Sequence, residues 1–395
     1  MSISKNFKYT RLASYIGYVT QAIVNNLAPL LFVTFSKDFG FDLESLSLLI
    51  TINFSVQILV DALSAGYIMK LGYRRASVLS HILAGLGLVF LGTLPFVMDP
   101  FLGLSIAIVF MAVGGGIDEV IISPIVEAIP GEAKEADMSL LHSFYSWGQM
   151  LVVLGSTLFF AVIGIENWRV LPFIWAVIPF LNAVLFIFVP IRELCEDEDK
   201  ISLKRIVKNK EFRILFIIML SAGASELGMS QWASLFAEEG LGVSKTMGDL
   251  LGPMSFAFFM GISRTLFGIK GSRMNLERCL VISGILCFLS YLITGLLRNP
   301  IIALSGCGLC GFSVGLLWPG TYSIGAKKMP WAGAKMFALL AFAGDLGCTS
   351  GPDVVGFIGN YTSNIKKGLL AGSFFPLLLV VGVLLLKGKS EKRSL

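Results

Sequence analysis

Long apolar stretches separated by short polar connections run through almost the whole chain. A membrane-spanning helix needs about 20 predominantly apolar residues, and glycine, proline and charged residues divide this sequence into twelve stretches of about that length. The predicted spans are 11–35, 45–69, 76–97, 101–127, 138–164, 169–190, 212–237, 246–269, 276–297, 300–326, 334–359 and 367–387. The pattern therefore predicts an all-α membrane protein with twelve transmembrane helices. Within the eleventh span, the glycine-rich run from Gly344 to Pro352 predicts a break in helical regularity.

The basic residues are distributed unevenly between the two ends of these spans. With the N-terminus in the cytoplasm, 25 of the 31 Lys and Arg residues lie on the inner side. Cytoplasmic loops carry an excess of Lys and Arg, and one missed span would invert every later loop. The distribution therefore supports the number of spans, and it predicts a multi-pass protein of the cell membrane with both termini in the cytoplasm. It also explains the net charge of +5 without a nucleic-acid partner.

The two halves of the chain resemble each other. Asp99-Pro100 before the fourth span recurs as Asn299-Pro300 before the tenth, and such motifs recur at offsets of 195 to 200 residues. This spacing indicates two six-helix repeats in parallel orientation. We predict an N-terminal six-helix bundle over 1–190, a cytoplasmic linker over 191–211, and a C-terminal six-helix bundle with a short cytoplasmic tail over 212–395. Within the linker, the basic segment 204–208 predicts a short amphipathic helix.

Composition excludes several classes of protein. Charged residues make up 14% of the chain and hydrophobic residues 55%, whereas soluble domains carry about 25% charged residues. The sequence contains no Gly-x-x-x-x-Gly-Lys-Ser/Thr motif, so ATP-driven transport has no support. It has only two His, and no His, Cys and Asp cluster has metal-binding spacing, so an enzyme has little support. We expect no catalytic activity, no cofactor and no metal.

Two adjacent acids lie inside the fourth span, at Asp118 and Glu119. A charge at the bilayer centre costs roughly 3 kcal/mol, so at least one of them must face water, a partner or a ligand. We predict that Glu119 is the coupling residue, which holds a proton in one state and releases it in another. Asp118 points about 100° away on the helix, and we interpret it as half of an ion pair. Asp118 and Glu226, an acid of the seventh span, remain further candidates for proton coupling.

Four short motifs resemble the major facilitator superfamily and, within it, the fucose permease branch of sugar–proton symporters. The basic Gly-Tyr-Arg-Arg loop at 72–75 resembles the superfamily's loop after the second span. The segment 119–124 resembles the branch's fourth-helix Glu-x-x-x-Asn-Pro, 226–232 its seventh-helix Glu followed by Trp, and 318–325 its tenth-helix Pro motif. One departure concerns the first helix, where the branch has an Asp shortly before a Pro. This chain has Asn-Asn-Leu-Ala-Pro at 25–29, so the second carboxylate of that scheme is absent.

The resemblance implies that spans one, four, seven and ten line a central cavity. On the first span, Tyr18, Gln21 and Asn25 share one helical face. Acids and amides interleaved with aromatic rings suit a polyhydroxylated ligand, although each polar group alone is also compatible with helix packing. The predicted substrate-binding residues are Gln21, Asn25, Asn26, Glu119, Ser123, Glu226, Gln231, Trp232, Trp318 and Tyr322.

A second set of polar residues lies on spans two, five, eight and eleven. The resemblance implies that these spans meet across the two halves, and we predict that the set forms gating contacts between the bundles, made in one access state and broken in the other. Its members are Asn53, Gln57, Asp61, His142, Arg264, Asp345 and Asp353. Asp345 is one option for the partner of Arg264.

The sequence thus predicts a secondary active transporter that moves a small polar solute, with a sugar as the expected class, by proton- or cation-coupled symport with alternating access. The expected partners are a small-molecule substrate, a coupling ion (a proton or sodium) and the lipid bilayer, and we expect a monomer. An exporter of amphipathic organic compounds stays open as an alternative. A non-transporting receptor is less favoured, because the chain has no sizeable soluble domain.

Overall fold

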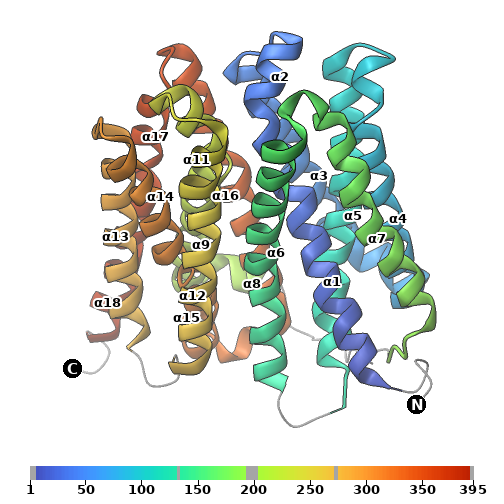
Figure 1. Ribbon diagram of the computed structural model, residues 1–395. Coiled ribbons are helices and arrows are strands. Elements are labelled where there is room, and N and C mark those ends of the chain that lie inside the picture. The colour runs from blue at the N-terminus through green and yellow to red at the C-terminus, as the bar shows by residue number, and fades with distance from the viewer. Residues whose placement is uncertain (1–5, 131–133, 193–202, 271–274, 392–395) are drawn as a thin grey trace. The chain divides into compact units, whose positions relative to one another are not determined.

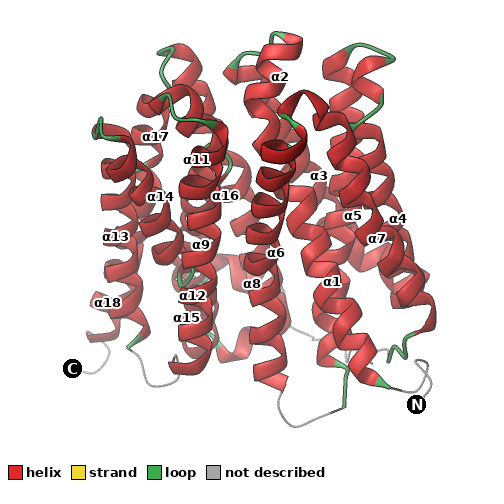
Figure 2. Ribbon diagram, viewed as in Figure 1, coloured by secondary structure: helices red, strands yellow, loops and turns green. Residues whose placement is uncertain are grey.

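The computed structural model describes residues 6–130, 134–192, 203–270 and 275–391, and this part of the chain is helical and contains no strand (Figure 2). Contacts divide the chain into two compact units, Met1–Cys195 and Glu196–Leu395. The long helices of the N-terminal unit are α1 (Phe7–Asn26), α2 (Phe32–Phe39), α3 (Leu43–Leu71), α4 (Tyr73–Leu91), α5 (Pro100–Glu127), α6 (Lys134–Ile163) and α7 (Leu171–Phe188) (Figure 1).

The C-terminal unit begins with the short helix α8, at the position of the predicted amphipathic helix. Its helices are α8 (Leu203–Lys208), α9 (Lys210–Ser230), α10 (Ala233–Leu235), α11 (Lys245–Asp249), α12 (Ser255–Lys270), α13 (Leu276–Leu296), α14 (Pro300–Val314), α15 (Leu317–Lys328), α16 (Gly333–Tyr361), α17 (Ile365–Gly372) and α18 (Phe374–Glu391). Several membrane spans consist of two or three consecutive elements, such as α9 with α10 and α14 with α15.

The predicted number of spans agrees with the structure. Within the described residues, eleven helical segments are long and apolar enough to cross a membrane. The 29-residue helix α16 lies outside that set, carries Asp345 and Asp353, and occupies the predicted eleventh span. With α16, each unit has six spans in the described part of the chain, so the prediction of an all-α, twelve-span protein is confirmed. The predicted break at Gly344–Pro352 is wrong, because α16 is one continuous helix through this run.

The glycines of α16 serve helix packing instead. A Cβ atom at Gly347 would overlap the carbonyl oxygen of Leu220 on α9, and one at Gly351 would overlap the carbonyl oxygen of Ala224. Small residues allow the backbones of two membrane helices to approach each other closely. The glycine-rich run therefore allows the close contact between α9 and α16 and does not bend α16.

Gly347→Ala is expected to destabilise the protein by about 1–3 kcal/mol, because the added methyl group meets rigid backbone atoms. Gly115→Ala on α5 is the matched control: its Cβ would lie 3.4 Å from Val24 Cγ1, an ordinary contact. We expect this control to be neutral or slightly stabilising. Thermal unfolding of the two purified variants checks the prediction, and equal melting temperatures would contradict it.

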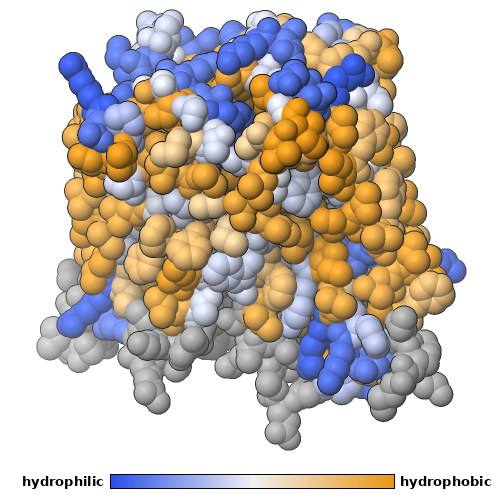
Figure 3. All heavy atoms as spheres, in the orientation of Figure 1, coloured by the Kyte–Doolittle hydropathy of each residue, from blue (hydrophilic) through white to orange (hydrophobic). Residues whose placement is uncertain are grey.

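The outer surface of α7 identifies it as a lipid-facing helix. Phe173, Val177, Leu181, Val184 and Phe188 recur every three or four residues and are between 40% and 65% exposed. This spacing places them on one stripe of the helix. On the face drawn in Figure 3, apolar side chains cover the sides of the helices, and hydrophilic side chains gather toward the helix ends. The distribution is that of a multi-pass membrane protein.

The sequence motif shared by the two halves is a helix start. The side chain of Asp99 accepts a hydrogen bond from the backbone N–H of Leu102 at 2.9 Å. Asn299 accepts in the same way from Ile301 and Ile302, at 3.0 and 3.2 Å. A proline follows each cap at the first helical position, where no N–H is needed. The fourth and tenth spans therefore begin with the same capping device.

The basic motif at 72–75 has a structural role in the N-terminal unit. Arg74 donates hydrogen bonds to the backbone carbonyls of Phe186, Ile187 and Val189, at 2.8, 2.6 and 2.9 Å. The last carbonyls of a helix lack partners within the helix. Arg74 therefore supplies donors to the C-terminal end of α7.

Three of the four spans that were expected to line a cavity are interrupted. In the first, α1 ends at Asn26, and Pro29 opens a short 3₁₀ turn before α2. In the seventh, α9 ends at Ser230, and two residues separate it from α10, which begins at Ala233. In the tenth, α14 ends at Val314 and α15 begins at Leu317. Interrupted helices are a recurring feature of the binding sites of secondary transporters.

Candidate functional site

Glu119 lies on α5 opposite the polar face of α1. The side-chain amide of Gln21 donates a hydrogen bond from Nε2 to Glu119 Oε2 at 2.7 Å. One turn away, before Gln21 in α1 and after Glu119 in α5, the hydroxyl oxygens of Tyr18 and Ser123 are 3.1 Å apart. Helical spacing aligns the two contacts, because Tyr18 and Gln21 are three residues apart and Glu119 and Ser123 are four. The structure thus brings the predicted residues Gln21, Glu119 and Ser123 together where α1 and α5 meet. We call the two contacts, Gln21–Glu119 and Tyr18–Ser123, the seam between α1 and α5.

A cluster of amides continues this seam on α3. Asn25 Oδ1 accepts hydrogen bonds from Asn53 Nδ2 at 3.1 Å and from Gln57 Nε2 at 2.8 Å. All three side chains are buried. Asn53 and Gln57, predicted as gating residues, therefore have partners within their own unit. Asn26 is directed elsewhere, because its amide donates to the carbonyl of Ala22 on its own helix at 2.9 Å.

In the C-terminal unit, Glu226 on α9 is paired with Arg264 on α12. Arg264 Nη2 lies 3.2 Å from Glu226 Oε1 and 3.3 Å from Oε2. Both side chains are largely buried, at 7% exposure for Glu226 and 16% for Arg264. Asp345 was one option for the partner of Arg264 in the sequence, and the structure supplies Glu226. Glu226 is therefore an acid with a fixed counterion.

Trp318 and Tyr322 lie one turn apart on α15, with ring centroids 6.3 Å apart. A Cβ atom at Gly344 of α16 would overlap the Trp318 ring, so the indole lies directly against the α16 backbone. Among the described residues, the Trp318 Nε1 atom is buried and has no hydrogen-bond partner. The two rings supply apolar faces, and the indole N–H is a donor available to a ligand.

Gln231 and Trp232 lie at the interruption between α9 and α10. Trp232 is fully buried, and its indole N–H donates to the carbonyl oxygen of Pro352 at 3.0 Å. Gln231 is 3% exposed and is the C-cap residue of α9. The hydrogen bond of Trp232 joins the interruption of the seventh span to α16, and its predicted role in substrate binding stays a prediction.

The remaining members of the predicted gating set lie on three helices. Asp61 lies on α3, His142 on α6, and Asp345 and Asp353 on α16. The exposed ring of His142 meets the Tyr18 ring edge-on, with centroids 5.3 Å apart. His142 is therefore adjacent to the seam of α1 and α5. The gating role of this set stays a prediction.

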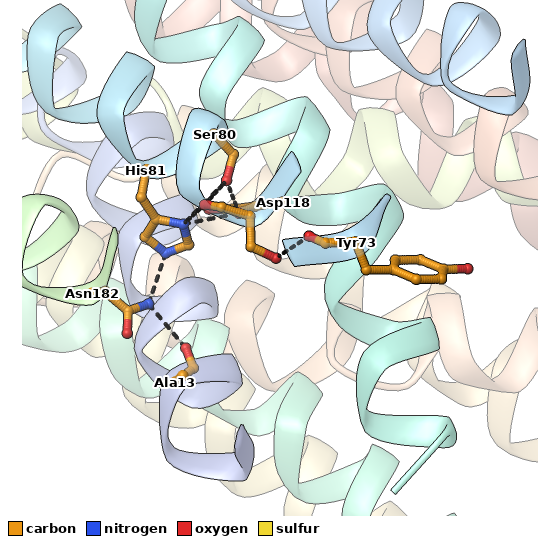
Figure 4. Close-up of polar contacts among 7 residues, drawn as sticks. Ala13, Tyr73, Ser80, His81, Asp118 and Asn182 are labelled. Carbon is orange, nitrogen blue, oxygen red and sulfur yellow. Dashed lines mark hydrogen bonds and ion pairs between the residues drawn. The ribbon is translucent and has the colours of Figure 1, made fainter. Parts of the chain in front are cut away.

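Asp118 belongs to a second polar cluster, which the sequence did not reveal (Figure 4). Ser80 and His81 on α4, Asp118 on α5 and Asn182 on α7 are all buried. Asp118 Oδ1 lies 2.5 Å from Ser80 Oγ and 3.3 Å from His81 Nδ1. Asp118 was predicted to be half of an ion pair, and its neighbours are a serine and a histidine. Asp118 and Glu119 therefore have different surroundings in the structure, as their separation of about 100° on the helix predicts.

The hydrogen-bond pattern defines the protonation of His81. Asn182 Nδ2 lies 2.9 Å from the carbonyl oxygen of Ala13 and 2.7 Å from His81 Nε2. A carbonyl can only accept, so the NH₂ group of Asn182 faces Ala13, and its second hydrogen is donated to His81 Nε2. His81 then carries its proton on Nδ1, which donates to Ser77 O at 2.8 Å. In this arrangement the imidazole is neutral.

One hydroxyl connects the histidine to the acid. Ser80 Oγ lies 2.5 Å from Asp118 Oδ1 and 2.8 Å from Ser77 O, yet it has a single hydrogen to donate. Ser80 donates to Asp118 Oδ1 in the structure; we propose that Asp118 can also be protonated, in which case the acid donates to Ser80 and Ser80 donates to Ser77 O. A neutral acid also avoids an uncompensated charge in a buried site.

Asp118→Asn is therefore expected to cost less than about 1 kcal/mol of stability, because a neutral amide can also donate to Ser80. Asp118→Leu leaves Ser80 and His81 without this partner and is expected to cost about 1–3 kcal/mol more. Thermal unfolding of the two variants provides the comparison. A loss of about 3–5 kcal/mol in Asp118→Asn would instead indicate an ionised acid paired with an imidazolium.

His81 is the site residue that the sequence analysis missed. It is one of only two histidines, and it lies inside the third predicted span, as its sixth residue. An ionisable residue inside a membrane segment is by itself a candidate functional residue.

Six spans in each of two units, with lipid-facing apolar stripes and buried acids and amides, define a polytopic membrane protein of the transporter class. The chain belongs to the Major Facilitator Superfamily, whose family model matches residues 14–352. The family predicted from the sequence motifs is thereby confirmed. A search of curated proteins returned no match.

Three solved structures illustrate the fold. The E. coli fucose:proton symporter FucP is 17% identical, with a TM-score of 0.65 over 96% of this chain and 98% of that chain. The nucleoside transporter NupG is 13% identical, with a TM-score of 0.74 over 96% and 99%. A bacterial homologue of the human lysosomal transporter Spinster is 13% identical, with a TM-score of 0.75 over 96% of each chain. At these identities the likeness shows the fold alone.

Proposed function

We propose that this protein is a secondary active transporter that moves a small polar solute, with a sugar as the best-supported class, by proton-coupled symport with alternating access. The supporting observation is the seam between α1 and α5. There the Gln21–Glu119 bond at 2.7 Å and the Tyr18–Ser123 contact at 3.1 Å align an acid, an amide and two hydroxyls. Such groups match the donors and acceptors of a hydroxyl-rich solute.

The roles within the proposed site follow from these contacts. Glu119 is the proton carrier in this proposal, and the amide of Gln21, which donates to Glu119 Oε2, can keep this hydrogen bond in either protonation state of the acid. Glu226 has the cation Arg264 beside it, and we assign its role to this ion pair rather than to carrying the proton. Trp318 and Tyr322 supply ring faces that cover the C–H surface of a sugar. FucP moves fucose and NupG moves nucleosides, and both of these solutes carry several hydroxyl groups.

We place both termini in the cytoplasm and the chain in the cell membrane, because 25 of 31 Lys and Arg residues then lie on the inner side. We propose a monomer as the working unit. Accessibility labelling of single cysteines introduced near Lys37 and near Lys208, in intact cells, tests the orientation: only the first should react with an impermeant reagent.

The function is tested with purified protein in liposomes. A thermal-shift screen of hexoses, nucleosides, amino acids and bile-type amphiphiles first identifies a stabilising solute. Uptake of that labelled solute is then measured with an inward proton gradient, with a sodium gradient, and with neither. We expect accumulation above the external concentration only with the proton gradient. Accumulation driven by sodium alone would replace the coupling ion, and binding confined to amphiphiles together with dye efflux from cells would favour the exporter.

A further inference from the structure

A basic pocket lies at the start of the C-terminal unit, away from the residues of the proposed transport site. Its volume is about 620 Å³, and its described lining consists of Lys204, Arg205, Lys208, Asn209 and Trp331. Three of these five residues are cations, and none is an acid. An open pocket with this lining favours an anion that fits several positive groups at once.

The position of α8 places this pocket at a membrane boundary. Lys208 ends α8, Asn209 caps the next helix, and the membrane span of α9 begins at Lys210. Ile206 is fully buried, so α8 is anchored to its unit. An element that ends two residues before a membrane span lies at the level of the lipid headgroups.

The two exposed faces of α8 differ in chemistry. Leu203 and Val207, four residues apart, are 53% and 48% exposed. Lys204 and Lys208, also four residues apart, form the adjacent exposed face. A short helix with neighbouring apolar and basic faces is typical of a segment that lies in the membrane interface. The apolar pair suits acyl chains, and the lysines suit the phosphates above them.

Arg205 is held by an aromatic ring. Its guanidinium carbon lies 4.7 Å from the centroid of the Trp331 ring, on the short helical turn between α15 and α16. A guanidinium attracted to an indole keeps its N–H groups in its own plane and so retains donors for an oxyanion. Trp331 therefore fixes the position of one of the three cations before any ligand arrives.

We propose that this pocket binds the phosphate of an anionic phospholipid, on the inner leaflet in the orientation proposed above. Basic pockets beside membrane helices at the cytoplasmic side are suited to such headgroups. A lipid matches both faces of α8, whereas free inorganic phosphate leaves Leu203 and Val207 without a partner. The site is independent of the transported solute, and it lies on the segment that leads into α9.

The test measures lipid retained by the full-length protein in detergent, by native mass spectrometry, after titration with phosphatidylglycerol or phosphatidylcholine. The variant Lys204→Gln/Arg205→Gln/Lys208→Gln removes the three cations. The matched control Arg298→Gln/Lys366→Gln/Lys367→Gln removes three charges elsewhere in the same unit. We expect phosphatidylglycerol to bind the pocket variant at least tenfold more weakly than the wild type, and the control variant to match the wild type. Phosphatidylcholine should not distinguish the three proteins.

Two results would overturn the proposal. One is equal phosphatidylglycerol binding by the pocket variant and the control. The other is complete displacement of the lipid by inorganic phosphate at the lipid's own concentration, which would define a free-phosphate site. Trp331→Ala provides a second variant that keeps all three cations, and we expect an intermediate weakening of phosphatidylglycerol binding because Arg205 loses its support. Thermal unfolding of each variant checks that it is folded.

Discussion

Glu119→Gln is expected to abolish gradient-driven accumulation of solute while leaving solute exchange across the membrane intact. Glutamine preserves the shape of the side chain and can still accept a hydrogen bond from Gln21, which lies 2.7 Å from the acid. It cannot take up or release a proton. A gradient of one pH unit with one proton per solute supports about tenfold accumulation, and in this variant the ratio should fall to about one.

The measurement compares uptake driven by a pH gradient with exchange of labelled for unlabelled solute at equal pH. Glu166→Gln is the matched control, because it removes an exposed acid from a short helical turn of the same unit. It should retain both activities. Undiminished accumulation by Glu119→Gln would remove this residue from coupling. Loss of exchange as well would assign it to solute binding or folding instead.

The seam around Glu119 could be predicted from the sequence in part. Helical spacing places Tyr18, Gln21 and Asn25 on one face of the first span and Glu119 above Ser123 on the fourth. It does not pair the two faces, because the rotation of each helix about its axis depends on packing against several neighbours at once. The structure supplies that rotation, and with it the contact between Gln21 and Glu119.

The cluster at His81 shows why other parts of the site were missed. The third span carries Ser77, Ser80 and His81 at spacings of three and four residues, so one of its faces is polar, but this spacing does not indicate which neighbouring helices that face meets. The partners of His81 come from residues that are 37 and 101 positions away in the chain, Asp118 and Asn182. Sequence reasoning found Asp118 from its cost in the membrane. The same cost marks His81 as a residue of interest, but its partners Asp118 and Asn182 could not be predicted, because they come from other helices.

The same limit applied to Arg264, whose partner is set by the packing of α9 against α12. From the sequence, Asp345 was one option for this partner, because every acid within a span needs compensation. The structure selects Glu226, 38 residues away, at 3.2 Å. Trp232 was predicted as a ligand contact with the motif at 226–232, and the structure adds a hydrogen bond from its N–H to the Pro352 carbonyl, which sequence spacing does not indicate.

Arg264→Met is expected to destabilise the C-terminal unit by about 3 kcal/mol, because it leaves the carboxylate of Glu226 buried without its cation. The double variant Glu226→Gln/Arg264→Met should regain most of this loss, since no buried charge remains. Lys328→Met is the control. It breaks the pair between Lys328 and Glu277, whose side chains are 18% and 25% exposed, and more exposed pairs contribute less than about 1 kcal/mol.

Transport by the double variant then decides what the Glu226–Arg264 pair does. If coupling rests on Glu119 and the pair serves to join α9 to α12, the double variant should still concentrate solute in a proton gradient, although the single variant is too unstable to do so. Uptake assays at matched amounts of folded protein make the comparison. A stable double variant that exchanges solute without concentrating it would move the coupling acid to Glu226, because the protein would then have lost its proton carrier without losing its fold.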